Sequence, residues 1–222
     1  MTLRRGESWF GERGAALVCA LMVIALLSTL GAALVVVVTT ECLIGANHRA
    51  AQLGLYGADA GVERAIGELR RLASWQAVPS AASTSPDFND GAMAPRMPDD
   101  TVLDLAGLTA ERQAESDVFY PGGPDRPVWR LFAHASLDRM VAGGIGAASP
   151  YVVVWVADDP DDLDGDPDRD ANNIVLVRSE AFGVRGARRT VEATIALHTA
   201  LDATMPGATR SDVSLIAWRQ VR

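Results

Sequence analysis

Residues 14–41 read GAALVCALMVIALLSTLGAALVVVVTTE, and no charged side chain precedes Glu41 in this stretch. As a helix, the segment from Ala15 to Val38 rises about 36 Å at 1.5 Å per residue. That length is sufficient to cross the hydrocarbon core of a bilayer, which is about 30 Å thick. The chain has no second apolar run of comparable length. The sequence therefore predicts a single transmembrane helix over residues 15–40.

The helical pattern continues beyond this span, over residues 41–75. Apolar side chains recur there at helical spacing, and most charged side chains fall elsewhere, which is typical of an amphipathic helix. The apolar stripe consists of Leu55, Val62, Ile66, Leu69 and Ala73. One long helix, half in lipid and half beyond it, is the simplest interpretation.

A basic leader, residues 1–14, precedes the span and carries Arg4, Arg5 and Arg13. Because flanking Arg and Lys residues set the orientation of a membrane span, we expect the N-terminus in the cytoplasm and the remainder of the chain outside. A cleavable secretory signal is the competing interpretation. The apolar core of such a signal is about 7 to 15 residues long, which is shorter than this span.

The acidic charge of the chain is concentrated in one place. The formal net charge is -8, and the segment from Asp158 to Asp170 contains eight Asp and one Arg, a local charge of -7. The rest of the chain is therefore almost neutral and has no stripe of Lys and Arg. A nucleic-acid partner bound through a basic face is not expected.

The sequence after residue 75 predicts a loop-rich segment followed by a series of strands. Residues 76–127 are rich in Pro, Ser, Gly, Asn and Asp, which predicts a long surface excursion with about one helical turn near residues 103–112. Residues 128–222 are then expected to form an antiparallel sheet. Five segments rich in Val, Ile, Leu, Trp and Phe predict its strands: 127–138, 150–159, 172–183, 188–200 and 211–222.

The fourth of these segments alternates cleanly, with Val191, Ala193, Ile195 and Leu197 on one side. This pattern predicts a strand with one buried and one solvated face. The short link from Gly183 to Gly186 predicts an antiparallel hairpin before it. An apolar sheet face needs a cover, and the amphipathic half of the long helix is available. We therefore expect an α+β fold, in which the N-terminal helix packs on a C-terminal antiparallel sheet.

Two stretches, residues 12–37 and 46–69, resemble the N-terminal region of PilX-like minor pilins of type IV pili. The family pattern is a basic leader that ends in Gly, a long apolar helix, and an N-x-R-x-A-x-x-x-A-x-A-G-x-E-like segment. The resemblance covers a little over a quarter of the chain and implies a pilin-like fold. The matching residues are Asn47, Arg49, Ala51, Ala58, Ala60, Gly61 and Glu63.

The resemblance implies that a prepilin peptidase cuts after Gly14 and leaves Ala15 as the mature, N-methylated terminus. Most major pilins carry Glu at the fifth mature position, which is Cys19 here. This departure favours a minor pilin, or the tip pseudopilin of a type II secretion system, over a filament-body subunit. The implied partners are other pilins, bound through the N-terminal helix. The implied locations are the bacterial inner membrane, with the domain in the periplasm, and then the pilus or pseudopilus.

The acidic loop, residues 158–173, has the character of a metal site. Ca²⁺ takes about six to eight oxygen ligands from flexible loops, and Asp residues at every second position around Gly165 could supply them. The register and the flanking strands do not match an EF-hand. A solvated acidic loop without an ion remains the alternative. The expected ligands are Asp162, Asp164, Asp166, Asp168 and Asp170.

Other polar and aromatic residues are expected to be structural. The three His residues, at 48, 134 and 198, have no metal-ligand spacing, and no nucleophile elbow, P-loop or C-x-x-C sequence is present. Trp129, Trp155 and Trp218 are expected to pack on the sheet. Cross-strand pairing on a solvated face is expected for four charged residues, which are Arg188, Arg189, Glu180 and Glu192.

The sequence thus predicts a non-enzymatic filament subunit, a PilX-like minor pilin that assembles through its N-terminal helix. The tip pseudopilin of a secretion system is one alternative. The other is a single-pass envelope protein that binds Ca²⁺ or a ligand without assembling.

Overall fold

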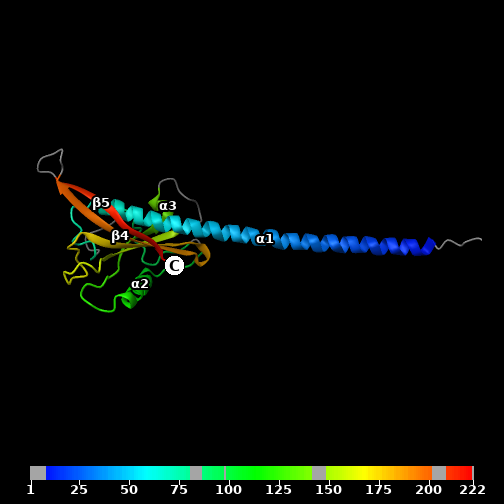
Figure 1. Cartoon of the computed structure of the whole chain (residues 1–222), viewed down its shortest axis with the longest axis horizontal. Helices are drawn as coiled ribbons and strands as arrows, with labels where there is room; N and C mark the ends of the chain where they lie inside the picture. The colour runs from blue at the N-terminus through cyan, green and yellow to red at the C-terminus, as the bar shows by residue number, and fades with distance from the viewer. Residues whose placement is uncertain (1–8, 81–86, 98, 142–148, 202–208, 222) are drawn as a thin grey trace, which may run out of the picture. The chain divides into compact units, whose positions relative to one another are not determined.

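The computed structural model describes residues 9–80, 87–97, 99–141, 149–201 and 209–221. The chain divides into two compact units, Met1–Arg49 and Ala50–Arg222, and we call the second the sheet domain. Figure 1 shows the elements. In chain order they are α1 (Trp9–Leu69), α2 (Leu105–Phe119), β1 (Arg130–Ser136), α3 (Leu137–Met140), β2 (Tyr151–Asp158), β3 (Ile174–Phe182), η1 (Val184–Gly186), β4 (Arg188–Leu201) and β5 (Thr209–Val221).

The long N-terminal helix is confirmed, and α1 runs for 61 residues. Within Met1–Arg49, the apolar side chains from Leu17 to Ile44 are about half exposed or more. The three Thr hydroxyl groups in this stretch are satisfied inside the helix, and Thr39 Oγ1, for example, donates to the Val35 carbonyl oxygen at 2.7 Å. A surface of this kind suits a medium that cannot hydrogen-bond to the chain.

The five strands form one sheet in the order β1-β2-β3-β4-β5, and every neighbouring pair is antiparallel. The expected hairpin is confirmed, because β3 and β4 pair along their length and are joined by Gly183, η1 and Ala187. All five predicted strands are present. Together with α1 they confirm the α+β fold.

The face of the sheet that packs on α1 carries the larger core. Val62, Ile66 and Leu69 of α1 are buried there with Val154 of β2. The four alternating residues of β4 lie in the same core, as their spacing predicts: Val191, Ala193, Ile195 and Leu197. Because successive side chains of a strand point to opposite faces of the sheet, these four residues all lie on the face toward α1.

Gly61 sets the distance between α1 and the sheet. A Cβ atom there would overlap with Ser179 Oγ and lie 2.7 Å from Val152 Cγ1. Ser179 and Val152 belong to β3 and β2, so the helix backbone passes directly over the centre of the sheet. Only a residue without a side chain permits this approach.

The helix ends earlier than its sequence pattern predicts. It stops at Leu69 rather than near residue 75, and Trp75 then folds back into the core with no exposed surface. The indole Nε1 of Trp75 donates to the Leu69 carbonyl oxygen at 3.1 Å. The Leu72 amide donates to the same oxygen at 3.1 Å, so this carbonyl group at the C-terminus of the helix accepts two hydrogen bonds.

The second face of the sheet is also covered over its central strands. The solvated face that the sequence predicts for β4 is found only in part, because Glu192 and Thr194 are half-buried and His198 is exposed. Every residue of β2 is buried, and Val153 and Trp155 point into a second core with Leu105 of α2. Figure 1 shows α2 and the last turns of α1 on opposite sides of the sheet. The sheet domain is therefore built in three layers.

The helix α2 is longer than the single turn that the sequence predicts. It spans 15 residues, and its N-cap Asp104 accepts hydrogen bonds from the amides of Ala106 and Gly107. Capping of this kind stabilises a helix by about 1 kcal/mol. The indole Nε1 of Trp155 donates to Thr109 Oγ1 at 2.8 Å and ties α2 to the sheet. Part of residues 76–127, which the sequence predicts as a surface loop, is thus a helix that forms one layer of the sheet domain.

Candidate functional site

The residues expected to be processed lie near the start of α1. Gly14 and Ala15 are helical and exposed. A Cβ atom added at Gly14 would meet nothing within 4 Å. Packing within the described residues therefore does not require a glycine at this position.

Cys19 and the segment around it present an uncharged surface. Cys19 is exposed and unpaired with any other cysteine, and the first charged side chain after Arg13 is Glu41. By length and composition, α1 is the one helix among the described residues that could cross a membrane. A charge at the centre of such a segment is costly, so the Cys is compatible with lipid on every side.

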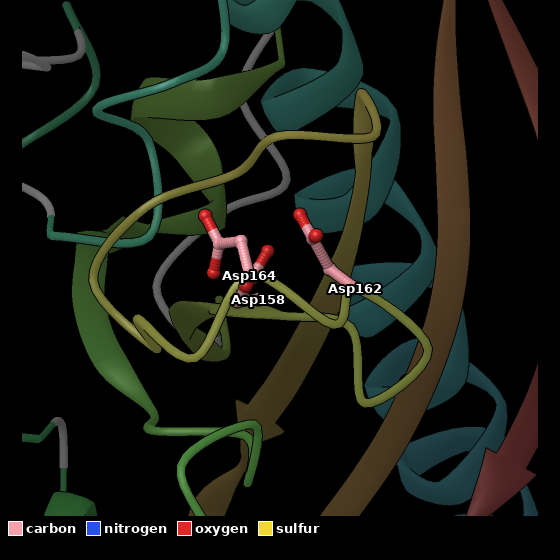
Figure 2. A group of neighbouring side chains, drawn as sticks. All are labelled: Asp158, Asp162 and Asp164. Carbon is pink, nitrogen blue, oxygen red and sulfur yellow. The ribbon is translucent and has the colours of Figure 1, made fainter.

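The acidic loop between β2 and β3 brings three carboxylates together. Asp158 ends β2, and Asp162 and Asp164 follow on the loop. One oxygen of each lies within 4.8 Å of the others, and Figure 2 shows the three side chains turned toward a common point. Asp158 is 3% exposed and Asp162 is 5% exposed. This group could hold an ion.

Two buried oxygens at this loop have no hydrogen-bond partner. They are Asp158 Oδ1 and Asp170 Oδ2, and Asp170 is only 1% exposed. The other Asp170 oxygen accepts from the amides of Asn173 and Ile174 at 2.6 Å and 3.2 Å. Burying a carboxylate oxygen without a partner is unfavourable, so both atoms require compensation.

The electrostatics of the loop reflect this crowding. Burial raises the pKa of Asp158 to about 8, and the charges of Asp162, Asp170 and Asp159 add to the rise. Burial also raises the pKa of Asp170 to about 6, although its backbone hydrogen bonds oppose the change. Desolvation and like charges both disfavour an ionised carboxylate. A bound cation would therefore reduce the unfavourable burial and mutual repulsion of these carboxylates.

The structure brings together two of the five expected ligands, Asp162 and Asp164, and adds Asp158. Asp166 is exposed, and its Oδ1 accepts from the Asp168 amide at 3.2 Å. Asp168 instead forms an ion pair with Arg130 at 2.8 Å. The alternating pattern missed Asp158 because its position depends on where β2 ends. The sequence indicates Asp158 only through its position, because it lies where the apolar segment that forms β2 meets the acidic loop.

Backbone groups fix the shape of the loop. Asp162 Oδ2 accepts from the amides of Ala171 and Asn172 at 2.6 Å and 3.1 Å. Asp159 Oδ1 accepts from Asn172 Nδ2 at 2.8 Å. Gly165 has φ +80°, a conformation that favours glycine. The carboxylates therefore converge on a loop that is already held by its own hydrogen bonds.

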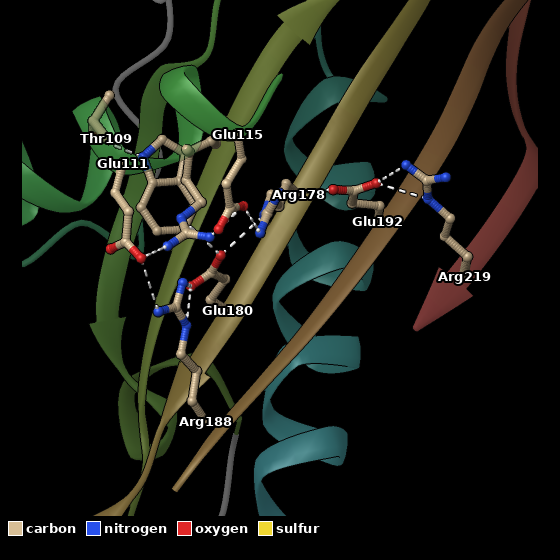
Figure 3. Close-up of polar contacts among 10 residues, drawn as sticks. Thr109, Glu111, Glu115, Arg178, Glu180, Arg188, Glu192 and Arg219 are labelled. Carbon is tan, nitrogen blue, oxygen red and sulfur yellow. Dashed lines mark hydrogen bonds and ion pairs between the residues drawn. The ribbon is translucent and has the colours of Figure 1, made fainter. Parts of the chain in front are cut away.

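A second polar cluster lies between α2 and the sheet, as Figure 3 shows. Glu180 is fully buried and pairs with Arg112, Arg178 and Arg188 at 3.3, 2.9 and 2.7 Å. The prediction that Glu180 pairs on a solvated face is wrong, because α2 covers it. Glu192 pairs with Arg178 at 2.9 Å. Since opposite charges surround each buried charge, the cluster anchors α2.

The Arg189 expected in that network lies outside it. Its Nη1 donates to the Arg188 carbonyl oxygen at 2.8 Å, and its Cγ would lie 3.2 Å from a Cβ on Gly54. Among the Trp residues, Trp129 and Trp155 are buried as expected. Trp218 is 45% exposed, and its Nε1 donates to Asp59 of α1 at 3.0 Å.

The His residues have structural or exposed positions. His134 is buried, and its Nδ1 lies 2.9 Å from the Tyr151 hydroxyl and 3.0 Å from Asp90 Oδ1. Burial lowers the pKa of His134 despite the opposing charge of Asp90. His198 lies 2.7 Å from Ser214 Oγ, and His48 is exposed on α1. None of them belongs to the carboxylate group at the acidic loop.

A long apolar N-terminal helix packed on a five-stranded antiparallel sheet defines a pilin-like α+β protein. Residues 13–63 match the model of the PilX N-terminal family. The N-terminal segment of this chain is therefore similar to that family, and the match covers less than a quarter of the chain. No curated protein and no solved structure shows significant similarity to the chain.

Proposed function

We propose that this protein is a minor pilin, a structural subunit that enters a type IV pilus or related filament through its N-terminal helix. The observation that carries the proposal is the PilX N-terminal match over residues 13–63 on a helix whose apolar side chains are exposed along its first half. Exposed apolar surface of this extent requires either lipid or other apolar helices around it. In pilins such a helix is surrounded first by lipid and then by the apolar helices of neighbouring subunits.

In this proposal the span at residues 15–40 first holds the protein in the bacterial inner membrane, with the leader in the cytoplasm and the sheet domain in the periplasm. A prepilin peptidase removes residues 1–14, and Ala15 becomes the N-terminus. On extrusion, the same apolar surface is buried against the helices of neighbouring pilins. No charged side chain has to leave lipid during this transfer, because the segment from Gly14 to Thr40 has none.

The residue at position 19 bears on the kind of subunit. A carboxylate at the fifth mature position can pair with the terminal amine of a neighbour, and Cys19 cannot do so. We therefore infer a minor or tip position, where the subunit has no neighbour ahead of it, in either a type IV pilus or a type II secretion pseudopilus.

One structural observation favours a second function, that of an envelope protein that binds a cation without assembling. It is the convergent carboxylate group of Asp158, Asp162 and Asp164. Processing separates the two functions, since an anchored binding protein needs no prepilin peptidase.

The test is to coexpress the full chain with a prepilin peptidase and determine the N-terminal sequence of the membrane fraction. We expect Ala15 at the N-terminus of the wild type, and the full leader in Gly14→Val. Gly31→Val is the matched control, because a Cβ at Gly31 also meets nothing within 4 Å. The control should be processed like the wild type. An intact leader in the wild type would leave the anchored binding protein as the better account.

A further inference from the structure

We propose that the loop between β2 and β3 binds one Ca²⁺ ion through Asp158, Asp162 and Asp164. The site lies within the sheet domain. It does not depend on how the N-terminal helix is used, and it differs from the alternating set of Asp residues that the sequence suggests.

The spacing of the oxygens fits this ion. Ca²⁺ binds oxygen at about 2.3–2.6 Å, so two ligands on opposite sides of the ion are about 4.6–5.2 Å apart. The selected oxygens of Asp158, Asp162 and Asp164 all lie within 4.8 Å of one another. Figure 2 shows that the three side chains approach from β2 and from two points on the loop. An ion could contact all three without a change of the backbone.

The burial of the acids argues against a merely solvated loop. Solvation would require the carboxylates to face water, but of the three proposed ligands only Asp164 is exposed, while Asp158 and Asp162 are 3% and 5% exposed. The Oδ1 atom of Asp158 has no hydrogen-bond partner among the described residues. A cation bound by the convergent group would compensate the burial of this carboxylate.

The chemistry of the ligands selects a hard cation of adaptable geometry. The convergent group contains Asp side chains alone, whereas zinc sites favour His nitrogen and Cys sulfur. Mg²⁺ demands near-octahedral geometry and keeps several waters. Ca²⁺ accepts irregular arrangements and carboxylates that bind through one or both oxygens. The irregular loop, with positive φ at Gly165 and Asn173, suits Ca²⁺ best.

Ca²⁺ at this loop would join three separate parts of the sheet domain. The Asp170 amide donates to the Gln76 carbonyl oxygen at 3.2 Å. The Gly165 amide donates to Asp125 Oδ1 at 2.7 Å, and Asp168 pairs with Arg130. The loop thus contacts the segment after α1, the segment after α2 and the start of β1. Binding at the loop should therefore stabilise the whole domain rather than the loop alone.

The experiment is thermal unfolding and calorimetric titration of the full chain in detergent, first stripped with a chelator, with CaCl₂ as the probe and MgCl₂ as the comparison. Extracellular calcium modules bind with Kd of about 0.1–1 mM, so the titration should extend to about 10 mM. We expect a Ca²⁺-dependent rise in Tm and one binding event per chain. Equal shifts with both metals, or no shift, would overturn the proposal.

Three variants distinguish a built site from diffuse charge. Asp158→Asn and Asp162→Asn should each weaken Ca²⁺ binding at least tenfold. Asp166→Asn is the matched control, since it removes the same charge from the same loop outside the convergent group. If Asp166→Asn weakened binding as much as the other two, the loop would attract cations only diffusely, which contradicts the proposal.

Discussion

Gly61 of α1 lies so close to Ser179 of β3 that even a methyl group on the glycine would overlap with the serine hydroxyl. The backbone of α1 therefore lies directly against the side chains of the sheet at Gly61. The glycine is one of the residues through which the chain resembles PilX-like proteins, and here it has a direct packing role.

Gly61→Ala should destabilise the sheet domain. Overpacking costs about 1–3 kcal/mol, and the gain in helix propensity returns about 1 kcal/mol. We expect a net loss of up to about 2 kcal/mol, measured as a lower Tm of the full chain in detergent. Gly67→Ala is the control, because a Cβ there meets nothing within 4 Å. It should raise stability by about 0.5–1 kcal/mol. Equal effects of the two substitutions would show that the contact is unimportant.

Glu180→Gln should be severely destabilising. The glutamate is fully buried and pairs with Arg112, Arg178 and Arg188, of which the first two are themselves buried. Removing one partner of a buried ion pair typically costs about 3–5 kcal/mol. Chemical unfolding of the variant measures this loss. Glu63→Gln, an exposed position on α1, should change stability by less than about 0.5 kcal/mol. A mild effect at Glu180 would mean that water reaches the cluster.

His134 should make the sheet domain less stable in mild acid. Its pKa is lowered by burial, so the unfolded chain binds a proton on this residue at a higher pH than the folded chain. Stability from this residue is therefore complete above the unfolded pKa of about 6.5 and is lost as the pH falls below it. The groups that face His134 are Asp90 and Tyr151.

The measurement is Tm against pH from about 7 to 5, compared between the wild type and His134→Gln. The wild type should lose stability more steeply than the variant across this range. His198→Gln, which changes an exposed His on β4, should follow the wild-type slope. Parallel curves for all three proteins would contradict a buried, neutral His134.

Removal of Ca²⁺ should expose the acidic loop to protease. Arg169 lies in this loop and is exposed, so trypsin can cut after it when the loop opens. We expect chelator to accelerate cleavage at Arg169 several-fold, and CaCl₂ to restore protection, since ligand binding suppresses local opening. Cleavage at Arg96, which is exposed in a different segment, should keep its rate. Equal acceleration at both sites would show that chelator does not open the acidic loop selectively, which contradicts this prediction.

Local periodicity accounts for what the sequence predicts well. The uncharged run from Gly14, the stripe at Val62, Ile66 and Leu69, and the alternation along β4 each require only near neighbours in the chain. These patterns correctly predict the long helix, the five strands and the face of the sheet that α1 covers.

The missed features depend on contacts between distant residues. The buried residues of α2 are Leu105 and Arg112. Arg112 pairs with Glu180 on β3 as well as with Glu111 and Glu115 on its own helix. A narrow apolar stripe with a buried arginine gives a weak helical signal. The same long-range packing decides that Glu180 is buried, and that Asp158 joins Asp162 and Asp164 while Asp166 and Asp168 do not.

The most direct test of the filament account is the N-terminal sequence of the native protein recovered from sheared surface filaments and, separately, from the inner membrane. We predict that the filament fraction contains the protein and that its chains begin at Ala15. Chains confined to the membrane fraction with residues 1–14 still attached would contradict assembly through this helix.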